Sequence, residues 1–157
     1  MADEVKLERA KQVYKTMCEA IERREWQCKR DDEKLYVYFG VSGEDIPMRF
    51  YLMVDVERQL IRVDSPLPFK MSEANRMEGA VATCVASFGL LDGSFDYDVR
   101  DGSISFRMTA SFIDSNIGEG LLQYIISASC AVVDKFNDKF LAIDKGLLSI
   151  TDFITKK

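Results

Sequence analysis

The amino-acid sequence predicts an α+β two-layer sandwich, in which one five-stranded antiparallel sheet is covered on one face by helices. Five segments alternate apolar and polar residues, which is typical of strands with one buried face. Three longer segments repeat apolar residues every three or four positions, which is typical of amphipathic helices. The order is α-β-β-β-α-β-β-α. The 157 residues, 47% of them hydrophobic and 30% charged, fit a single domain spanning residues 1–157.

The first helix is predicted from Asp3 to about Arg24, because one stripe of its surface is apolar and the opposite side is charged. The polar run from Lys29 to Lys34 ends the helical pattern and leads into the first alternating segment. The apolar stripe consists of Ala10, Val13, Tyr14, Met17, Cys18 and Ile21.

Three strands follow, and their apolar residues define the buried face of the sheet. A turn at 42–45 joins the first two strands, and a tight turn at Glu57 and Arg58 would place Leu52 opposite Val63 and Val54 opposite Ile61. Proline cannot donate to a strand ladder, so the prolines within 65–69 end the third strand. The inward residues of the first two strands are Leu35, Val37, Phe39 and Val41, then Ile46, Met48, Phe50, Leu52, Val54 and Val56.

A second helix is predicted between Ser72, a suitable N-terminal cap, and Gly89, a suitable C-terminal residue. Its bulky apolar residues recur at helical spacing, so we expect this stripe to face the core. The stripe consists of Met77, Ala80, Val81, Cys84, Val85 and Phe88.

A hairpin comes next, and Asp101-Gly102 suits a two-residue turn because both positions tolerate positive φ. Such a turn places inward and outward residues in fixed opposite pairs. The predicted pairs are Phe95 with Met108, Tyr97 with Phe106, Val99 with Ile104, Asp96 with Arg107 and Asp98 with Ser105.

The last helix is predicted to start near Asn116, with Glu119 three residues later as in a capping box. The tail from Leu147 to Ile154 is apolar enough to pack against the domain. The buried side of the helix is predicted to carry Leu121, Leu122, Ile125, Ile126, Ser129, Cys130, Val133, Phe136 and Phe140.

The stretch from Gly89 to Phe112 resembles the YbjN-like family of bacterial sensory transduction regulators, whose fold is similar to that of type III secretion chaperones. The family pattern runs from a helix through a glycine and a phenylalanine to an acidic strand, a DG turn and a strand with an aromatic residue followed by arginine. The resemblance implies a non-enzymatic regulator or binding module with no active site, and the chaperone relatives are dimers that hold partner polypeptides extended. The matching residues are Gly93, Phe95, Asp96, Asp101, Gly102, Phe106 and Arg107.

Several kinds of chemistry are disfavoured by composition. The chain has no histidine, which removes histidine-dependent acid, base and triad mechanisms, and its four cysteines form no CxxC pair that would indicate zinc. The acidic groups at 31–33 and 44–45 lie in polar loops, where fully ionised carboxylates are expected. A calcium loop beginning at Asp96 would have Arg107 at its twelfth position instead of an acid. We therefore expect no enzyme activity, no cofactor and no metal site.

The net charge of −5 and the pI near 4.9 make nucleic acid and anionic membrane surfaces poor partners. The N-terminal residues are charged from Asp3, unlike a secretory signal, so we expect a cytoplasmic protein with reduced cysteines. The longest apolar stretch, Leu121 to Val133, is too short to cross a bilayer.

The outward face of the first three strands is the candidate partner-binding site. Exposed aromatic and methionine side chains rimmed by polar groups are typical of partner surfaces. The predicted registers place Tyr36 opposite Tyr51 and Tyr38 opposite Arg49. Two alternatives stay open: the tail could fold over this face, or the tyrosines could sit there because of their strand propensity. The candidate residues are Tyr36, Tyr38, Arg49, Tyr51, Met53 and Leu60.

The sequence thus predicts a cytosolic, chaperone-like or regulatory protein-binding module that buries apolar surface against a partner polypeptide or its own copy as a homodimer. The alternative function is a small-molecule or lipid-binding domain with a cavity between sheet and helices. The methionine and cysteine residues of the apolar stripes would suit an adaptable cavity of that kind, and they suit ordinary core packing equally well.

Overall fold

The structure, a computed structural model, describes residues 2–156 and has an α+β architecture. The helices are α1 (Ala2–Arg23), α2 (Arg76–Phe88), α3 (Glu119–Asp144) and α4 (Ile150–Lys156), and a 3-10 turn, η1 (Glu73–Asn75), precedes α2. The strands are β1 (Cys28–Asp31), β2 (Tyr36–Val41), β3 (Met48–Asp55), β4 (Leu60–Lys70), β5 (Ser94–Asp98) and β6 (Ser103–Ser111).

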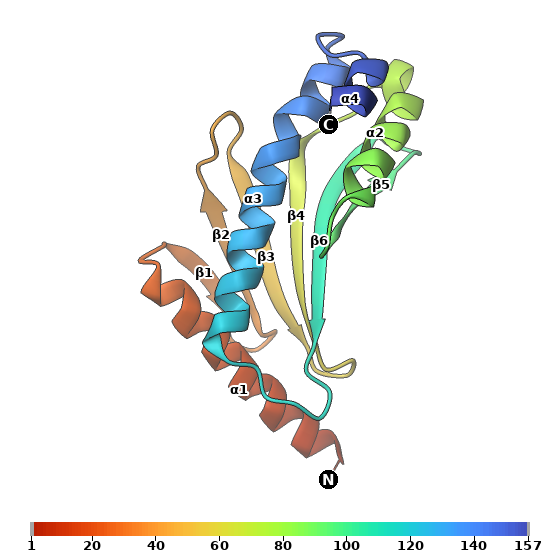
Figure 1. The fold of residues 1–157 in the computed structure, drawn as a ribbon. Helices are drawn as coiled ribbons and strands as arrows, with labels where there is room; N and C mark the ends of the chain where they lie inside the picture. The colour runs from red at the N-terminus through yellow and green to blue at the C-terminus, as the bar shows by residue number, and fades with distance from the viewer. Residues whose placement is uncertain (1, 157) are drawn as a thin grey trace.

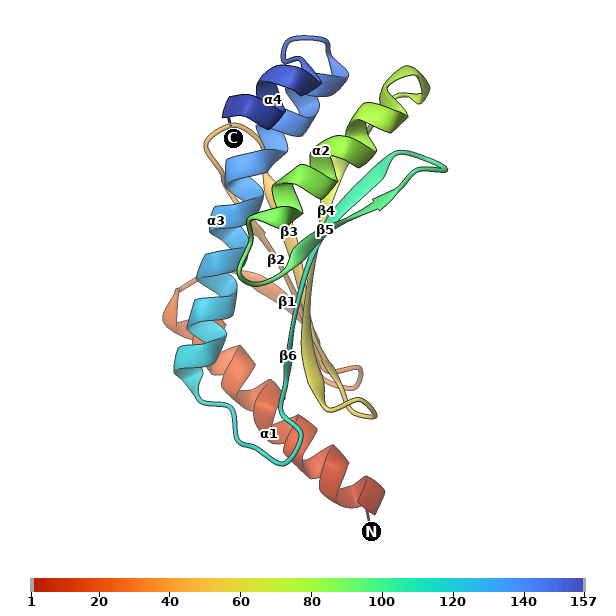
Figure 2. The same ribbon diagram turned by 45° about the vertical axis from the view of Figure 1, so that its right-hand side comes forward.

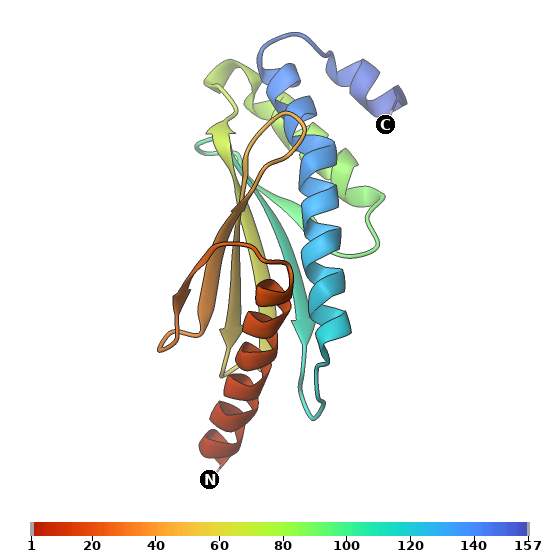
Figure 3. The same ribbon diagram turned by 90° about the vertical axis from the view of Figure 1, so that its left-hand side faces the viewer.

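The strands form one open antiparallel sheet in the order β1-β2-β3-β4-β6-β5. The helices pack together on one face of this sheet, with α3 lying along its middle (Figures 1 and 2). Figure 3 shows the same two layers from the side, and no described element lies over the opposite face of the sheet. We call that opposite side the outer face.

The sheet has six strands, so the prediction of five was wrong, and the order of elements differs from the predicted one. The additional strand, β1, lies at the sheet edge and overlaps the polar run that was predicted to be irregular. Its four residues are half-buried or exposed, so it shows no apolar alternation. The apolar tail also forms an unpredicted helix, α4, whose Phe153 is buried.

The register between β3 and β4 is as predicted, with Leu52 opposite Val63 and Val54 opposite Ile61. The prediction that the prolines within 65–69 end this strand was wrong, because β4 continues to Lys70 with an irregular register after Pro66. The β2–β3 register differs from the prediction by two residues, because pairing begins at Met48 and not at Ile46. Pro47 cannot donate a hydrogen bond to the ladder. The longer loop is tied to α3, since Asp134 Oδ1 accepts the N–H of Glu44 at 3.0 Å.

The β5–β6 register is also shifted by two residues, so the predicted pairs of this hairpin were wrong. Phe95 lies opposite Phe106, and Tyr97 lies opposite Ile104. The turn is wider than predicted because the carbonyl of Asp98 accepts the N–H of Gly102 at 2.7 Å, and Gly102 has φ +79°. Arg107 still forms an ion pair with Asp96 at 3.1 Å, although the two residues are diagonal neighbours.

The core lies between the sheet and the helices. The predicted stripe of α1 is buried, which confirms the orientation of that helix. At the other end of the core, Phe95 of β5 packs edge-on against Phe136 and Phe140 of α3, with ring centroids 5.7 and 5.0 Å apart. Phe153 of α4 completes this cluster.

Three details of the helix predictions were wrong. Leu121 of α3, predicted to be buried, is exposed. The last helix begins at Glu119, after Gly118, and no side-chain hydrogen bond caps it, so Asn116 does not start a capping box. In α2 four of the residues predicted to be buried, Met77, Val81, Cys84 and Phe88, face solvent, whereas Val85 is partly buried and packs against the core. The residues that α2 buries are Gly79, Ala82, Thr83 and Ala86.

Candidate protein-binding surfaces

The predicted partner-binding residues lie on the outer face, and four of them occupy adjacent positions. Tyr36 is directly opposite Met53, and Tyr38 is directly opposite Tyr51. The rings of Tyr38 and Tyr51 have centroids 4.8 Å apart and are tilted by 40°. We call these four residues the tyrosine patch, and all four are half-buried.

The other two predicted residues lie beside the tyrosine patch. Arg49 is exposed and opposite Gly40, where Tyr38 was expected. Leu60, the first residue of β4, is opposite Asp55. The predicted pairs were therefore wrong, but all six residues share one face because a shift of two residues preserves side-chain direction.

The C-terminal tail does not cover the tyrosine patch. In α4, Phe153 packs against Phe136 and Phe140 with ring centroids 6.4 and 6.2 Å apart, and these two rings belong to the helix layer. Among residues 2–156 no helix or loop lies over Tyr38 and Tyr51, so the patch faces solvent.

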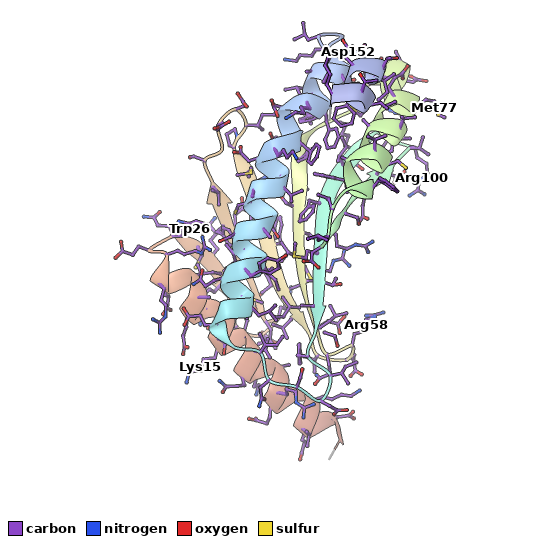
Figure 4. All side chains as sticks on the ribbon, in the orientation of Figure 1. Lys15, Trp26, Arg58, Met77, Arg100 and Asp152 are labelled. Carbon is purple, nitrogen blue, oxygen red and sulfur yellow. The ribbon has the colours of Figure 1, made fainter. Side chains whose placement is uncertain are left out.

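A second apolar surface, not predicted from the sequence, lies on α2 and the segments beside it. Met77 is 69% exposed, Val81 42% and Phe88 93%, and Met77, labelled in Figure 4, projects from the side of α2 that faces away from α3. Cys84 lies on the same side and is exposed. We call Met77, Val81, Cys84 and Phe88, together with exposed Leu91 in the following loop and Val99 at the hairpin tip, the α2 surface.

Close packing of α2 on β5 explains why its bulky residues point outward. A Cβ at Gly79 would lie 2.6 Å from the Tyr97 hydroxyl and 2.8 Å from Met71 Cγ, so only glycine allows this approach. The Tyr97 hydroxyl donates to the carbonyl of Arg76 at 2.7 Å and fixes the helix there. A hollow of about 570 Å³ runs between α2 and β5 beside Cys84, Phe88 and Val99.

The signal that could have revealed the α2 surface is a helix with two apolar stripes. One stripe is bulky, and the other consists of glycine, alanine and threonine. Small residues let a helix approach a sheet closely, as Gly and Ala do between helices in membranes. When a helix carries both stripes, the small one is able to form the tighter contact, which leaves the bulky one for another partner.

Two of the acidic groups considered for acid-base chemistry, Asp31 and Asp32, have structural partners. The Tyr14 hydroxyl donates to Asp32 at 2.7 Å, and Arg30 lies over the Tyr14 ring. Burial, helped by the bond to Asp32, raises the pKa of Tyr14, whereas the Tyr14 hydroxyl holds the pKa of Asp32 below its ordinary value. Tyr14 therefore stays protonated and Asp32 ionised near neutral pH, which suits a tether between α1 and the turn that joins β1 to β2. Asp31 accepts the N–H groups of Glu33 and Lys34 in the adjoining turn.

The carboxylates of the second hairpin are similarly engaged. Asp98 pairs with Arg100, and Asp101 accepts hydrogen bonds from Ser103 and Lys70. Bonds from the hydroxyl and N–H of Ser103 lower the pKa of Asp101 strongly. Across residues 2–156 no group of three or more acidic or cysteine side chains is arranged to hold a metal ion.

In the described part of the chain, none of the helices combines the length and hydrophobicity needed to span a bilayer. No family model matches the sequence, and no curated protein matches it either.

Proposed function

We propose that this protein is a non-enzymatic protein-binding module that buries apolar surface against other polypeptides, and that its α2 surface binds a second copy of the same chain. The observation that carries the proposal is the exposure of bulky apolar side chains on a helix that already packs on its own sheet through small residues. Monomeric soluble proteins seldom expose contiguous apolar patches of this kind unless a partner covers them.

Burial energetics favour association at the α2 surface. Removing apolar surface from water stabilises a complex by about 25 cal/mol per Å². Phe88 and Leu91 are almost fully exposed, so both would contribute most of their side-chain area to a contact. Met77 and Val81 extend the same surface along α2. A helix face broadened by a loop and a hairpin tip presents a larger contact area than a single helix does.

A second copy is favoured over an unrelated charged partner because the centre of the α2 surface is uncharged. In a two-fold symmetric contact the same surface meets itself, so central charges would face like charges. The outward residues Val81, Cys84 and Phe88 carry no charge. The charged residues of α2, Arg76 and Glu78, are half-buried and lie at its N-terminal end.

Three further observations support the proposal. The resemblance of residues 89–112 to the YbjN-like family, whose chaperone relatives are dimers, agrees with self-association. All four cysteines are free, which suits a cytosolic location because disulfides are rare in that compartment. The space between sheet and α3 is filled by fully buried side chains, which favours a binding surface over an internal ligand cavity. These side chains include Phe39, Phe50, Phe106, Phe136, Phe140 and Met17.

The first prediction concerns the double substitution Val81→Ser with Phe88→Ser. Both side chains are exposed within the chain, so the fold should persist, with a far-UV circular dichroism spectrum like that of the wild type. Sedimentation equilibrium should give twice 17.9 kDa for the wild type and 17.9 kDa for the variant at the same concentration. We expect the dimer dissociation constant to rise by at least tenfold.

A matched control is Val5→Ser with Ile113→Ser. These side chains are also exposed and apolar but lie in α1 and in the β6–α3 loop, away from α2. The control should stay dimeric. A wild-type chain of 17.9 kDa at high concentration, or equal weakening by the control, would refute binding of a second copy at the α2 surface.

A further inference from the structure

The outer face of the sheet has an unequal distribution of paired and unpaired charges. The carboxylates that the strands carry on the outer face form hydrogen bonds or ion pairs with other residues of the same chain. Asp31 accepts two backbone N–H groups of the following turn. The others form the ion pairs Asp55–Arg58 at 3.0 Å, Asp64–Arg62 at 2.6 Å, Asp96–Arg107 at 3.1 Å and Asp98–Arg100 at 2.8 Å.

Two cations of the same face are left over, and both border the tyrosine patch. Lys29 of β1 lies directly opposite Tyr38, and Arg49 of β3 lies two residues before Tyr51. Both side chains are exposed, and neither forms a hydrogen bond or ion pair with another described residue. A partner that covers the patch would meet positive charge there without a carboxylate of this chain to balance it.

The geometry of the patch suits an extended chain. Lys29, Tyr38 and Tyr51 form one row across three adjacent strands, which are spaced about 4.8 Å apart. Arg49 precedes Tyr51 by two residues in β3, which corresponds to about 7 Å at the rise per residue of a strand. The two cations thus lie at opposite corners of a platform made by aromatic rings. An extended segment that crosses this platform diagonally would contact the rings between the two cations.

A hollow beside Tyr38 gives the platform a place for a side chain. Gly40, opposite Arg49, has no side chain on this face, and a hollow of about 300 Å³ adjoins it. Because Lys29 lines this hollow, a carboxylate that enters it can pair with the Lys29 ammonium. The lining residues are Gln27, Cys28, Lys29, Tyr38, Phe39 and Gly40.

From these observations we infer that the outer face binds an acidic polypeptide segment in extended form. Apolar side chains of the segment pack on the tyrosine patch, and its carboxylates pair with Lys29 and Arg49. The inference rests on the proposed function as a protein-binding module but is independent of the α2 surface, which lies in the other layer. Two free cations among several acidic residues are too few for a nucleic acid, whose affinity depends on neutralising many phosphates.

The test uses the full chain and a fluorescein-labelled eight-residue peptide of alternating Glu and Leu. Fluorescence anisotropy should show saturable binding that weakens as salt is raised, because exposed charge pairs are screened. Lys29→Glu with Arg49→Glu should weaken binding by at least tenfold. The conservative pair Lys29→Arg with Arg49→Lys should retain it, which separates a charge effect from misfolding.

The matched control is Lys11→Glu with Lys15→Glu, which makes the same change in net charge on exposed residues of α1. This variant should bind the peptide as the wild type does. Equal weakening by the control, equal binding of a Lys-Leu peptide, absence of saturable binding, or displacement of the peptide by oligo(dT) would each overturn the inference.

The solution mass distinguishes this inference from the proposed function. Lys29→Glu with Arg49→Glu should leave the sedimentation mass unchanged, since neither residue belongs to the α2 surface. A chain that is dimeric but binds no acidic peptide refutes only the inference about the outer face. A monomeric chain that binds the peptide refutes only self-association through α2.

Discussion

Asp144, the last residue of α3, holds the segment that precedes α2 by hydrogen bonds. Its Oδ1 accepts the N–H and the hydroxyl of Ser72, both at 2.8 Å, and the side-chain amide of Asn75 also contacts it. Burial alone would raise the pKa of Asp144, but the hydrogen bonds from Ser72 and Asn75 outweigh it and hold the pKa below its ordinary value. The carboxylate thereby fixes the segment that leads into α2.

The second prediction is that Asp144→Asn lowers the free energy of unfolding by about 1 kcal/mol at pH 7, because a charged hydrogen-bond acceptor at a partly exposed site is lost. A pKa that is lower in the folded state gives stability above the unfolded pKa, about 3.9, and this stability is lost as pH falls through the folded pKa. The difference between wild type and variant should therefore shrink at pH 3.

Urea unfolding at pH 7 and at pH 3 measures this difference. Asp138→Asn is the matched control, since Asp138 lies on the same helix and its carboxylate accepts no hydrogen bond from another described residue. The control should behave like the wild type at both values of pH. An Asp144→Asn difference that is the same at pH 3 and pH 7 would show that the carboxylate does not act in this way.

Residue types predicted the turn of the second hairpin but not its length. Gly102 was predicted to suit a turn because it tolerates positive φ, and its φ is +79°. Gly93, which matches the glycine of the YbjN-like pattern, has the same φ. The register was wrong because Gly102 also makes a tertiary contact, its carbonyl accepting the N–H of Met71 at 2.8 Å. Met71 lies 31 residues earlier in the sequence, so local turn preferences could not show this contact.

At the scale of elements, periodicity identifies a helix but does not decide which stripe is buried. The small stripe of α2, with Gly79, Ala82 and Ala86, allows the helix backbone to approach β5. A sequence-based rule that larger apolar residues lie inside therefore gave the wrong orientation. The same rule was right for α1, whose only continuous apolar stripe is the bulky one.

The third prediction compares two glycines that lie in helices. Gly79→Ala should destabilise the fold by about 1–3 kcal/mol, since the added methyl would overlap Tyr97 and Met71 and overpacking has costs of this size. Gly120→Ala in α3 should be neutral or stabilising by up to about 1 kcal/mol, because its Cβ would meet nothing within 4 Å and alanine favours helix.

Thermal unfolding of the two variants by circular dichroism checks this contrast. The control separates the contact with β5 from the general effect of replacing a helical glycine by alanine. If Gly79→Ala were as stable as Gly120→Ala, the close approach of α2 to β5 would not be the reason for the outward direction of the bulky residues.

The edge strand β1 was not predicted from the sequence. In β1 the outward residue Lys29 is exposed and the inward Cys28 is only half-buried, so hydrophobic alternation was too weak to indicate a strand. The strong alternation of β3 and β4 predicted their register correctly, because both strands are central and buried on one face. For the candidate site, alternation predicted which residues point outward but not which residues lie opposite one another, since cross-strand pairing depends on loop length.

At the scale of the whole molecule, the two layers separate two apolar surfaces. The tyrosine patch belongs to the sheet, and the α2 surface belongs to the helix layer at the end of the sheet near β5 (Figures 1 and 4). Because the surfaces lie on different layers, a second copy on α2 leaves the outer face open. A symmetric pair would then present two outer faces for partner segments.

The most direct test of the account is intermolecular cross-linking at Cys84, which lies near the middle of α2. In a two-fold contact centred on this helix, Cys84 meets its own copy, and a disulfide forms when the Cα atoms lie within about 7 Å. Cys18 is buried, and burial raises the pKa of the Cys130 thiol to about 11, so neither competes under mild oxidation at neutral pH.

Mild oxidation followed by non-reducing electrophoresis should convert the wild-type chain to a covalent dimer that reductant reverses. Cys28→Ser should still give this dimer, whereas Cys84→Ser should not. A chain that stays monomeric on the gel under these conditions, or a covalent dimer that persists in Cys84→Ser, would contradict the assignment of the α2 surface as the contact between two copies.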